Sequence, residues 1–344
     1  MSRSIAVRRA TAASRYGTAV GAIVVLVLAL APMFFVDSAL RTLLQFFYLL
    51  ALAEMWNLLA GFAGLVSIGQ QAYIGIGAYS LLVFADHLGA NFFLSIFLAG
   101  LVAGALAIPT AALVFRLRGG YFAIGTWVVA EVYLLLIANT QSLGGGSGVT
   151  ITSAIAIAPT TRLYVTYWIA LAVAVASVLG VYALIRTRLG LALRAVRDRE
   201  AAAPTLGIDV LRAKVQIYVL TSAVCGLIGA IIYANLLRLQ PGATFSVNWS
   251  AFMIFAVVIG GIGTITGPIV GTLIYFSLQQ YLADLGPIYL IILGAVAVLV
   301  MVRAPKGLWG LVLDRWDLRF FPVEIRVRTL DPPQPGAAQR RTRP

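Results

Sequence analysis

The stretch "NLLAGFAGLVSIGQQAYIGIGAY", residues 57–79, decides the fold of this chain. Its aliphatic and aromatic residues suit a lipid environment, yet glycines and the polar residues Asn57, Ser67 and Gln70 interrupt it. A glycine in a helix costs about 1 kcal/mol relative to alanine. In lipid, every backbone group that a break releases must find another partner. The stretch therefore predicts a membrane helix that is broken in its interior.

The composition of the whole chain agrees with a membrane fold. Of its 344 residues, 61% are hydrophobic and 11% are charged, whereas a soluble domain has about 45–50% apolar and about 25% charged residues. Apolar runs lie at 18–36, 41–60, 63–86, 91–115, 121–139, 162–185, 215–237, 250–281 and 287–303. A spanning helix needs roughly 20 such residues, whereas the strands of a membrane barrel alternate over about 10. We predict an all-α, polytopic inner-membrane protein with about 8–10 membrane elements, some broken by glycine.

A second glycine-rich stretch, "VVIGGIGTITGPIVG" at 257–271, lies inside a run that is too long for one span. We predict two segments that meet there at a break. Either the glycines of both stretches allow close helix packing, or they break helices whose free backbone groups line a substrate path. The polar residues beside the first break favour the path. Its candidate residues are Asn57, Gly61, Gly64, Ser67, Gln70, Glu131, Gly260, Gly261, Gly263 and Pro268.

Two carboxylates, Glu54 and Glu131, fall within apolar runs. A charge at the bilayer centre costs at least about 2.5–3.5 kcal/mol, so such residues usually face a cavity or a partner. Glu131, in the middle of "WVVAEVYLLL", is the better functional candidate, although a structural ion pair or a hydrogen-bonded neutral acid would explain it equally well. The single His87 and the single Cys225 predict no metal site and no intrachain disulfide.

The basic residues predict which side each loop occupies. The net charge is +13, but it is gathered in the gaps between apolar runs, a pattern of cytoplasmic loops rather than of a nucleic-acid footprint. The clusters are Arg3, Arg8, Arg9 and Arg15, then Arg116 and Arg118, then residues 186–214, and finally Arg303 and Lys306. We therefore expect cytoplasmic termini and loop 186–214, with residue 200 inside and residue 145 outside.

The charge pattern also divides the chain into regions. We expect a cytoplasmic basic N-terminus at 1–17, a transmembrane domain at 18–310 and a cytoplasmic, basic, partly disordered tail at 311–344. The first apolar run resembles a signal peptide. Its length and the proline at position 32 favour an uncleaved membrane helix instead.

The chain carries no signature of catalysis. It has no G-x-x-x-x-G-K-S/T phosphate loop, no H-E-x-x-H and no G-x-S-x-G. We expect neither an enzymatic activity nor a cofactor bound by this chain.

Four stretches together resemble a known family. They are residues 56–79, then "LRGGYFAIGTWVVAEVYLLLIANTQSLGGGSGVT", "LGLALRAVRDREAAAPTLGIDVLRAKVQIYVLTSAVCGLIGAIIYA" and "VVIGGIGTITGPIVGTLI". In this order, over roughly residues 45–310, the chain resembles the permease subunits of branched-chain amino acid ABC importers, the LivM and LivH type, and LivM more closely. The family also carries urea, short amides and other small amino compounds.

The resemblance implies an assembly around this chain. It comprises a second, LivH-like permease subunit, two ATPase subunits that bind ATP and Mg, and a periplasmic solute-binding protein. It further implies that loop 186–214 forms short helices that dock into an ATPase. The mixture in "AAAPTLGI" of apolar residues with a helix-ending glycine agrees with such docking. The candidate coupling residues are Arg194, Arg197, Asp198, Arg199, Glu200, Ala203, Leu206, Gly207, Ile208 and Lys214.

Two other functional classes remain open. An ion-coupled secondary transporter of small polar solutes would use Glu54 or Glu131 to carry a proton, but few intramembrane charges and no membrane histidine are present. A polytopic membrane enzyme would need a catalytic cluster near one interface, and no motif for one is seen. ATP dependence of uptake and co-purification with an ATPase separate the importer from both.

Overall fold

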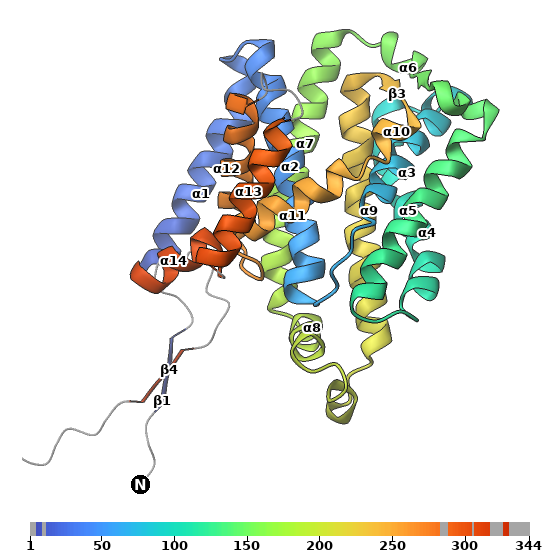
Figure 1. Cartoon of the computed structure of the whole chain (residues 1–344). Coiled ribbons are helices and arrows are strands. Elements are labelled where there is room, and N and C mark those ends of the chain that lie inside the picture. The colour runs from blue at the N-terminus through green and yellow to red at the C-terminus, as the bar shows by residue number, and fades with distance from the viewer. Residues whose placement is uncertain (1–4, 9–11, 283–287, 305, 317–325, 330–344) are drawn as a thin grey trace, which may run out of the picture.

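The chain folds into a bundle of helices, as the composition predicts (Figure 1). This computed structural model describes residues 5–8, 12–282, 288–304, 306–316 and 326–329. Within these residues, 7 helices are long and apolar enough to cross a membrane, and a shorter apolar helical stretch covers Ala19–Met33. The all-α, polytopic fold class is therefore confirmed.

The main helices follow the predicted apolar runs closely. They are α1 (Ala12–Leu30), α2 (Asp37–Asn57), α3 (Gln71–Leu82), α4 (Phe92–Val114), α5 (Gly120–Ala138), α7 (Pro159–Ile185), α9 (Val210–Leu236), α11 (Asn248–Gly260), α12 (Thr266–Leu282) and α13 (Ile288–Arg303). Shorter helices are α6 (Thr152–Ile155), α8 (Arg188–Asp198), α10 (Pro241–Thr244) and α14 (Gly307–Trp316). Two antiparallel strand pairs complete the described elements, β1 (Ile5–Arg8) with β4 (Arg326–Thr329) and β2 (Val149–Thr150) with β3 (Arg238–Leu239).

Short 3-10 and π turns join or extend these helices. The 3-10 turns are η1 (Ala31–Met33), η4 (Gln141–Leu143), η5 (Gly145–Ser147) and η6 (Ala203–Leu206). The π turns are η2 (Leu58–Phe62), which continues α2, and η3 (Val83–His87), which continues α3.

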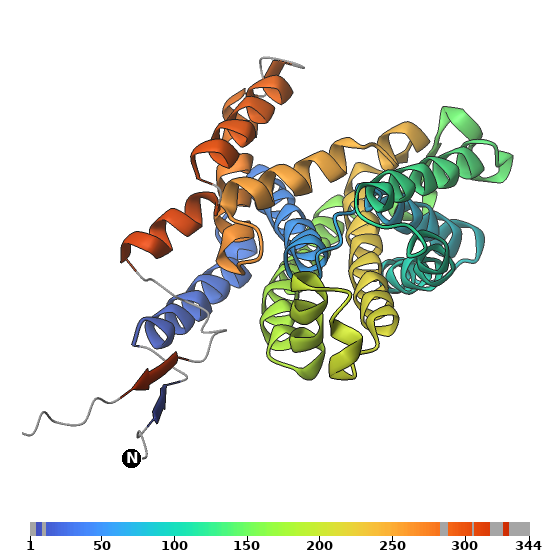
Figure 2. The ribbon, with the colours of Figure 1, turned by 60° about the horizontal axis from the view of Figure 1, so that its bottom comes forward.

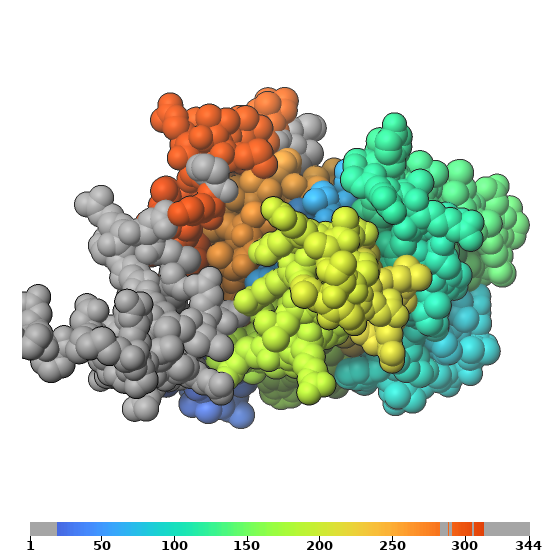
Figure 3. Space-filling model, turned by 90° about the horizontal axis from the view of Figure 1, so that it is seen from below, coloured from blue at the N-terminus to red at the C-terminus, as the bar shows by residue number. Residues whose placement is uncertain are grey.

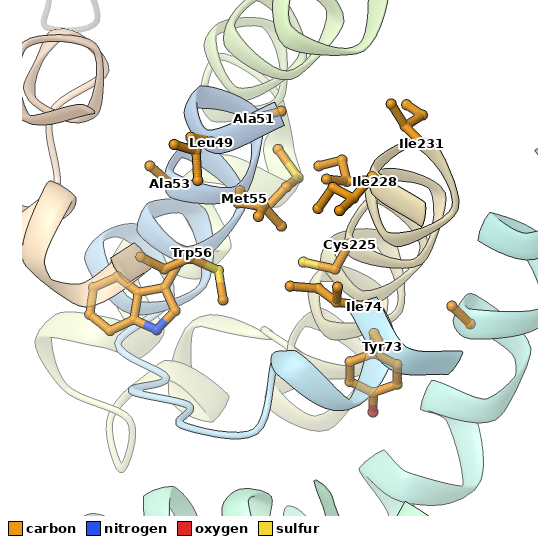
Figure 4. Packing of buried hydrophobic residues seen from close by; sticks show 14 of the residues in the cluster. Leu49, Ala51, Ala53, Met55, Trp56, Tyr73, Ile74, Cys225, Ile228 and Ile231 are labelled. Carbon is orange, nitrogen blue, oxygen red and sulfur yellow. The ribbon is translucent and has the colours of Figure 1, made fainter. Parts of the chain in front are cut away.

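Small residues bring α3, α4 and α9 together at the centre of the bundle. A Cβ atom on Gly77 would lie 1.8 Å from the carbonyl oxygen of Gly226, and one on Gly229 would lie 2.1 Å from that of Ile74. Figure 4 shows Tyr73 and Ile74 of α3 beside Cys225 and Ile228 of α9, with Met55 of α2 approaching from the other side. Close packing thus accounts for the glycines of α3 and α9, as the packing interpretation requires.

Both predicted glycine-rich breaks interrupt helices. Residues 63–70 are not helical, so the run at 63–86 becomes an irregular segment followed by the short helix α3. The long run divides into α11 and α12, as expected, and α11 ends at Gly260. Gly261 and Gly263 have φ angles of +132° and +76°, which side-chain-bearing residues rarely adopt.

The basic segments gather at one end of the bundle, and Figure 1 shows α8, α14, β1 and the turn between α4 and α5 there. At the opposite end lie α6 and β3. This arrangement agrees with the sidedness that the charges predict, although the compartment at each end stays a prediction. The predicted N-terminal region 1–17 and tail 311–344 are described only in part, and residues 1–4, 9–11, 317–325 and 330–344 lie outside the described residues.

Candidate functional site

Asn57, the last residue of α2, joins the two glycine-rich stretches. Its side-chain Nδ2 donates a hydrogen bond to the carbonyl oxygen of Thr264 at 2.9 Å. Its Oδ1 accepts one from the backbone N–H of Gly263 at 2.8 Å. Asn57 is fully buried, so its amide supplies the partners that the broken backbone between α11 and α12 cannot obtain from lipid.

The contact between the end of α2 and the break between α11 and α12, here called the junction, requires glycine on both sides. A Cβ atom on Gly61 would lie 2.4 Å from Oδ1 of Asn57 and 2.6 Å from the backbone nitrogen of Gly263. A Cβ atom on Gly260 would lie 1.8 Å from the carbonyl oxygen of Gly267 in α12. The end of α2, the end of α11 and the start of α12 therefore meet backbone against backbone.

The irregular segment 63–70 is held by side chains from three helices. The N–H of Ile68 donates to Oγ1 of Thr126 in α5 at 3.2 Å, and the hydroxyl of Ser250 in α11 donates to the carbonyl of Ile68 at 2.9 Å. The indole nitrogen of Trp56 in α2 donates to the carbonyl of Ser67 at 2.9 Å. These contacts replace the helical hydrogen bonds that the break removes and fix the start of α3.

Several buried polar groups beside this segment have unused hydrogen-bonding capacity. Both amide atoms of Gln70, which is 1% exposed, lack a partner among the described residues, as do both carboxyl oxygens of the buried Glu54. Gln71 contacts the hydroxyl of Ser250 through Oε1, while its Nε2 has no partner in the same set. Most buried polar groups in proteins are bonded, so these exceptions mark the region as a candidate site for a polar ligand.

The structure brings most of the predicted path residues together, but not all. Asn57, Gly61, Gly260, Gly261, Gly263 and Pro268 surround the junction, and Ser67 and Gln70 lie at the start of α3. Gly64 is exposed and packs on Arg197. Glu131 lies apart, on an exposed side of α5, whose buried face carries Phe122, Thr126 and Ala130. A role of these residues in transport stays a prediction.

Five residues of this region were not among the predicted path residues. They are Trp56, Gln71, Thr126, Ser250 and Thr264. Thr126 and Ser250 are isolated polar residues in apolar runs, a signal that sequence reasoning can use. The hydrogen bonds of Trp56 and Thr264 connect distant parts of the chain, so no local pattern reveals them.

The basic segment forms two short helices before α9 begins. Helix α8 buries Leu193 and Val196 on one face and ends at Asp198. The 3-10 turn η6 follows and ends at Gly207, whose φ of +75° is the left-handed geometry that stops a helix. Figure 3 shows this yellow-green segment standing forward on the end of the molecule where the basic loops lie.

The structure divides the predicted coupling residues between two environments. Leu206 at the tip is 73% exposed, Ile208 is partly buried and Ala203 is buried. Lys214 of α9 forms an ion pair with Glu200 at 2.6 Å. Asp198 pairs with Arg197 at 3.0 Å, Arg199 is exposed, and Arg194 is partly buried. Docking onto an ATPase is not tested by this geometry and stays a prediction.

A helical bundle with helices that break inside it, and with buried polar groups at the breaks, has the architecture of a membrane transport protein. The chain belongs to the family of permease components of branched-chain amino acid transport systems, whose family model matches residues 38–302. A permease component works as one part of such a system.

Individual relatives agree with this membership. The chain is 28% identical to the high-affinity branched-chain amino acid transport system permease protein LivM of Escherichia coli, over 86% of this chain and 76% of the relative. It is 25% identical to a probable LivM of Methanocaldococcus jannaschii, over 70% and 71% of the two chains. A shorter similarity, 35% identity over 34% of this chain and 38% of the relative, links it to the ribose import permease protein RbsC of Bacillus subtilis. No solved structure matches this chain significantly.

No cluster of three or more His, Cys, Asp or Glu side chains that could hold a metal ion occurs among the described residues. The polar groups at the breaks are amides, hydroxyls and backbone groups, which bind neutral or zwitterionic solutes by hydrogen bonds.

Proposed function

We propose that this chain is a transmembrane subunit of an ATP-driven importer for branched-chain amino acids or a related small amino or amide compound. The observation that carries the proposal is the family match over residues 38–302, which covers both broken helices and the basic segment. The solute would pass the region of Asn57, Ser67 and Gln70, where hydrogen-bonding groups lie between helix ends.

The same proposal assigns partners and a location. The chain would lie in a bacterial inner membrane with both termini in the cytoplasm, since basic loops favour that side. It would pair with a second, LivH-like permease subunit and receive solute from a periplasmic binding protein. Two ATPase subunits would bind ATP and Mg and dock on residues 186–214, so that this chain holds no cofactor and performs no chemistry.

One observation favours the ion-coupled transporter as a second candidate. Glu54 is a fully buried carboxyl in α2 with no hydrogen-bond partner among the described residues. A carboxyl inside a membrane protein is a common carrier of protons in secondary transporters.

Reconstitution separates the two candidates. The chain is purified with the subunits that accompany it, inserted into liposomes, and supplied with binding protein and radiolabelled leucine or urea. The importer predicts uptake that requires ATP hydrolysis and is unaffected by protonophores. Uptake that is independent of ATP and is abolished by a protonophore would overturn the proposal in favour of the ion-coupled transporter.

A further inference from the structure

One side chain of the basic segment contacts the helix junction directly. Arg197, in the last turn of α8, donates a hydrogen bond from Nη1 to the carbonyl oxygen of Gly61 at 2.9 Å. Gly61 belongs to η2, the π turn that continues α2. The contact therefore joins the basic segment to the end of α2 across 136 residues of sequence.

The guanidinium group is held in place for this contact. Its Nε and Nη2 both lie 3.0 Å from Oδ1 of Asp198, which leaves Nη1 for Gly61. Gly64 makes room for the side chain, because a Cβ atom there would lie 3.2 Å from Cγ of Arg197. Gly64 also has a φ of +71°, which a larger residue would rarely adopt. The aspartate, the arginine and the glycine thus form one site.

The carbonyl that Arg197 contacts lies in the tightest part of the junction. Gly61 is the residue whose added Cβ would collide with Asn57 and Gly263. Asn57 in turn bonds to Gly263 and Thr264. Three hydrogen bonds, together with the close packing of Gly61 against Asn57, therefore connect α8, the end of α2 and the break between α11 and α12.

The series continues to the C-terminal helices. The hydroxyl of Thr264 donates to the carbonyl of Gly261 at 2.9 Å. Gly261 packs against the turn before α14, since a Cβ atom on it would lie 2.8 Å from the carbonyl oxygen of Lys306. Figure 2 shows α11 crossing the molecule toward α12.

We propose that Arg197 is the positioning residue that transmits movement of segment 186–214 to the break between α11 and α12. This inference rests on the proposed function, because an ATPase must move the segment. Packed contacts of this kind shift between discrete arrangements instead of deforming gradually. A displacement of α8 would either break the hydrogen bond from Arg197 to the Gly61 carbonyl or move that carbonyl with it. Asn57 would pass the change to Gly263 and Thr264.

The inference makes Arg197 different from other basic residues at the same end of the bundle. Arg118, in the turn between α4 and α5, is exposed and belongs neither to segment 186–214 nor to the predicted path. Removing its charge changes the net charge at this end by the same amount as removing the charge of Arg197. Arg197 donates a hydrogen bond to the backbone at the end of α2, so its removal should separate ATP hydrolysis from transport.

The test compares Arg197→Gln with Arg118→Gln in the complete importer. Each complex is purified from the membrane with its accompanying subunits and reconstituted in liposomes with binding protein and radiolabelled leucine. The measurement is the number of leucine molecules taken up per ATP hydrolysed, together with subunit stoichiometry. We expect Arg197→Gln to assemble, to keep its ATPase activity and to lose about tenfold or more in this ratio, since hydrogen bonds to charged groups have effects of that size. Arg118→Gln should keep the wild-type ratio.

A double-mutant cycle with Asn57→Ala adds a second test. If both residues act in one series of contacts, the ratio in the double variant should be no lower than in the worse single variant. Arg197→Lys, which keeps the charge and one donor, should restore part of the ratio.

Three outcomes would overturn the inference: an unchanged ratio in Arg197→Gln, a proportional loss of uptake and ATP hydrolysis, or a failure of both Arg197 variants to assemble. If the wild-type complex itself takes up leucine without ATP, the proposed function fails instead, and the two failures are distinguishable.

Discussion

At the scale of single residues, the carboxyl group of Glu54 discriminates between transport mechanisms. It is buried in α2 without a hydrogen-bond partner among the described residues. We predict that Glu54→Gln, which keeps the size of the side chain and removes its ionisable proton, leaves ATP-driven uptake within about twofold of wild type. Such a substitution preserves the packing around the side chain. Uptake is measured in the reconstituted complex with and without a pH gradient.

The matched variant Glu54→Leu would remove the polar group entirely and serves as the packing control. A complete loss of uptake in Glu54→Gln, with the complex assembled, would contradict the importer mechanism and support proton coupling through this residue.

Gly61 is a second residue at which a small change, the addition of one methyl group, should lower the stability of the protein. In Gly61→Ala the new methyl group would displace Oδ1 of Asn57 and the N–H of Gly263, 2.4 and 2.6 Å from its ideal position. We predict a loss of roughly 1–3 kcal/mol in stability, the range for breaking buried hydrogen bonds. The measurement is the melting temperature of the purified protein in detergent.

Gly21→Ala in α1 is the control, since a Cβ atom there would meet nothing within 4 Å. Alanine should raise helix stability at that position. Equal melting temperatures for the two variants would show that the junction relaxes without cost.

At the scale of elements, the tip of the basic segment is the predicted docking site. We predict that Leu206→Asp weakens co-purification of the ATPase by about tenfold or more, because a charge forced into a desolvated contact costs several kcal/mol. Leu206 is 73% exposed at the end of η6, so the fold of the permease should be unaffected. The measurement is the amount of ATPase recovered with a tagged permease.

Leu88→Asp is the control for this variant, because Leu88 is 65% exposed and directly follows η3, outside segment 186–214. Normal recovery of the ATPase with Leu206→Asp would show that the tip of the segment does not dock onto the ATPase and that the segment only sets the orientation of the chain.

On the opposite end, Asp86 fastens two loops through a pH-sensitive contact. Its carboxylate accepts hydrogen bonds from the N–H and hydroxyl of Thr152, at 2.6 and 2.8 Å, and from the N–H of Ser153 at 2.9 Å. Partial burial raises the pKa of Asp86, but the hydrogen bonds from Ser153 and Thr152 outweigh it and lower the pKa below its ordinary value. The contact therefore stabilises the folded state above the unfolded pKa and is lost as the pH falls through the lower, folded value.

We predict that Asp86→Ala speeds amide hydrogen exchange in the turn around α6 at neutral pH. The difference from wild type should shrink as the pH falls through the lowered pKa of Asp86, where the aspartate becomes protonated in the folded state. Mass spectrometry of peptides covering residues 150–158 measures it. A difference that persists unchanged at low pH would show that the charge of Asp86 is not responsible.

The elements also show what sequence reasoning can and cannot reach. The break between α11 and α12 was predictable, because a run too long for one span contains Gly260, Gly261 and Gly263. The irregular segment 63–70 was less so, because its residues are still mostly apolar and only tertiary contacts from Thr126 and Ser250 hold it open. The inward contact of Arg197 depends on a partner 136 residues away, which no local charge pattern encodes.

At the scale of the whole molecule, the charges and the helix directions give the same division into two ends. The basic turn between α4 and α5, α8 and α14 fall at one end of the bundle, and the loops around α6 and β3 fall at the other (Figure 1). The positive-inside rule assigns the basic end to the cytoplasm. This assignment also places the Arg197 contact on the side where an ATPase could act on it.

Cysteine labelling tests this orientation. Ser142 in η4, before α6, and Ala201, after α8, are both exposed, and α6 and α8 lie at opposite ends of the bundle (Figure 1). The native Cys225 is buried and should react little. We predict that Ser142→Cys reacts with a membrane-impermeant maleimide in spheroplasts, whereas Ala201→Cys reacts only after the membrane is permeabilised. Labelling of Ala201→Cys in sealed spheroplasts would show that the orientation is the reverse of the predicted one. It would also withdraw both the docking proposal and the path of transmission through Arg197, because an ATPase in the cytoplasm could then reach neither.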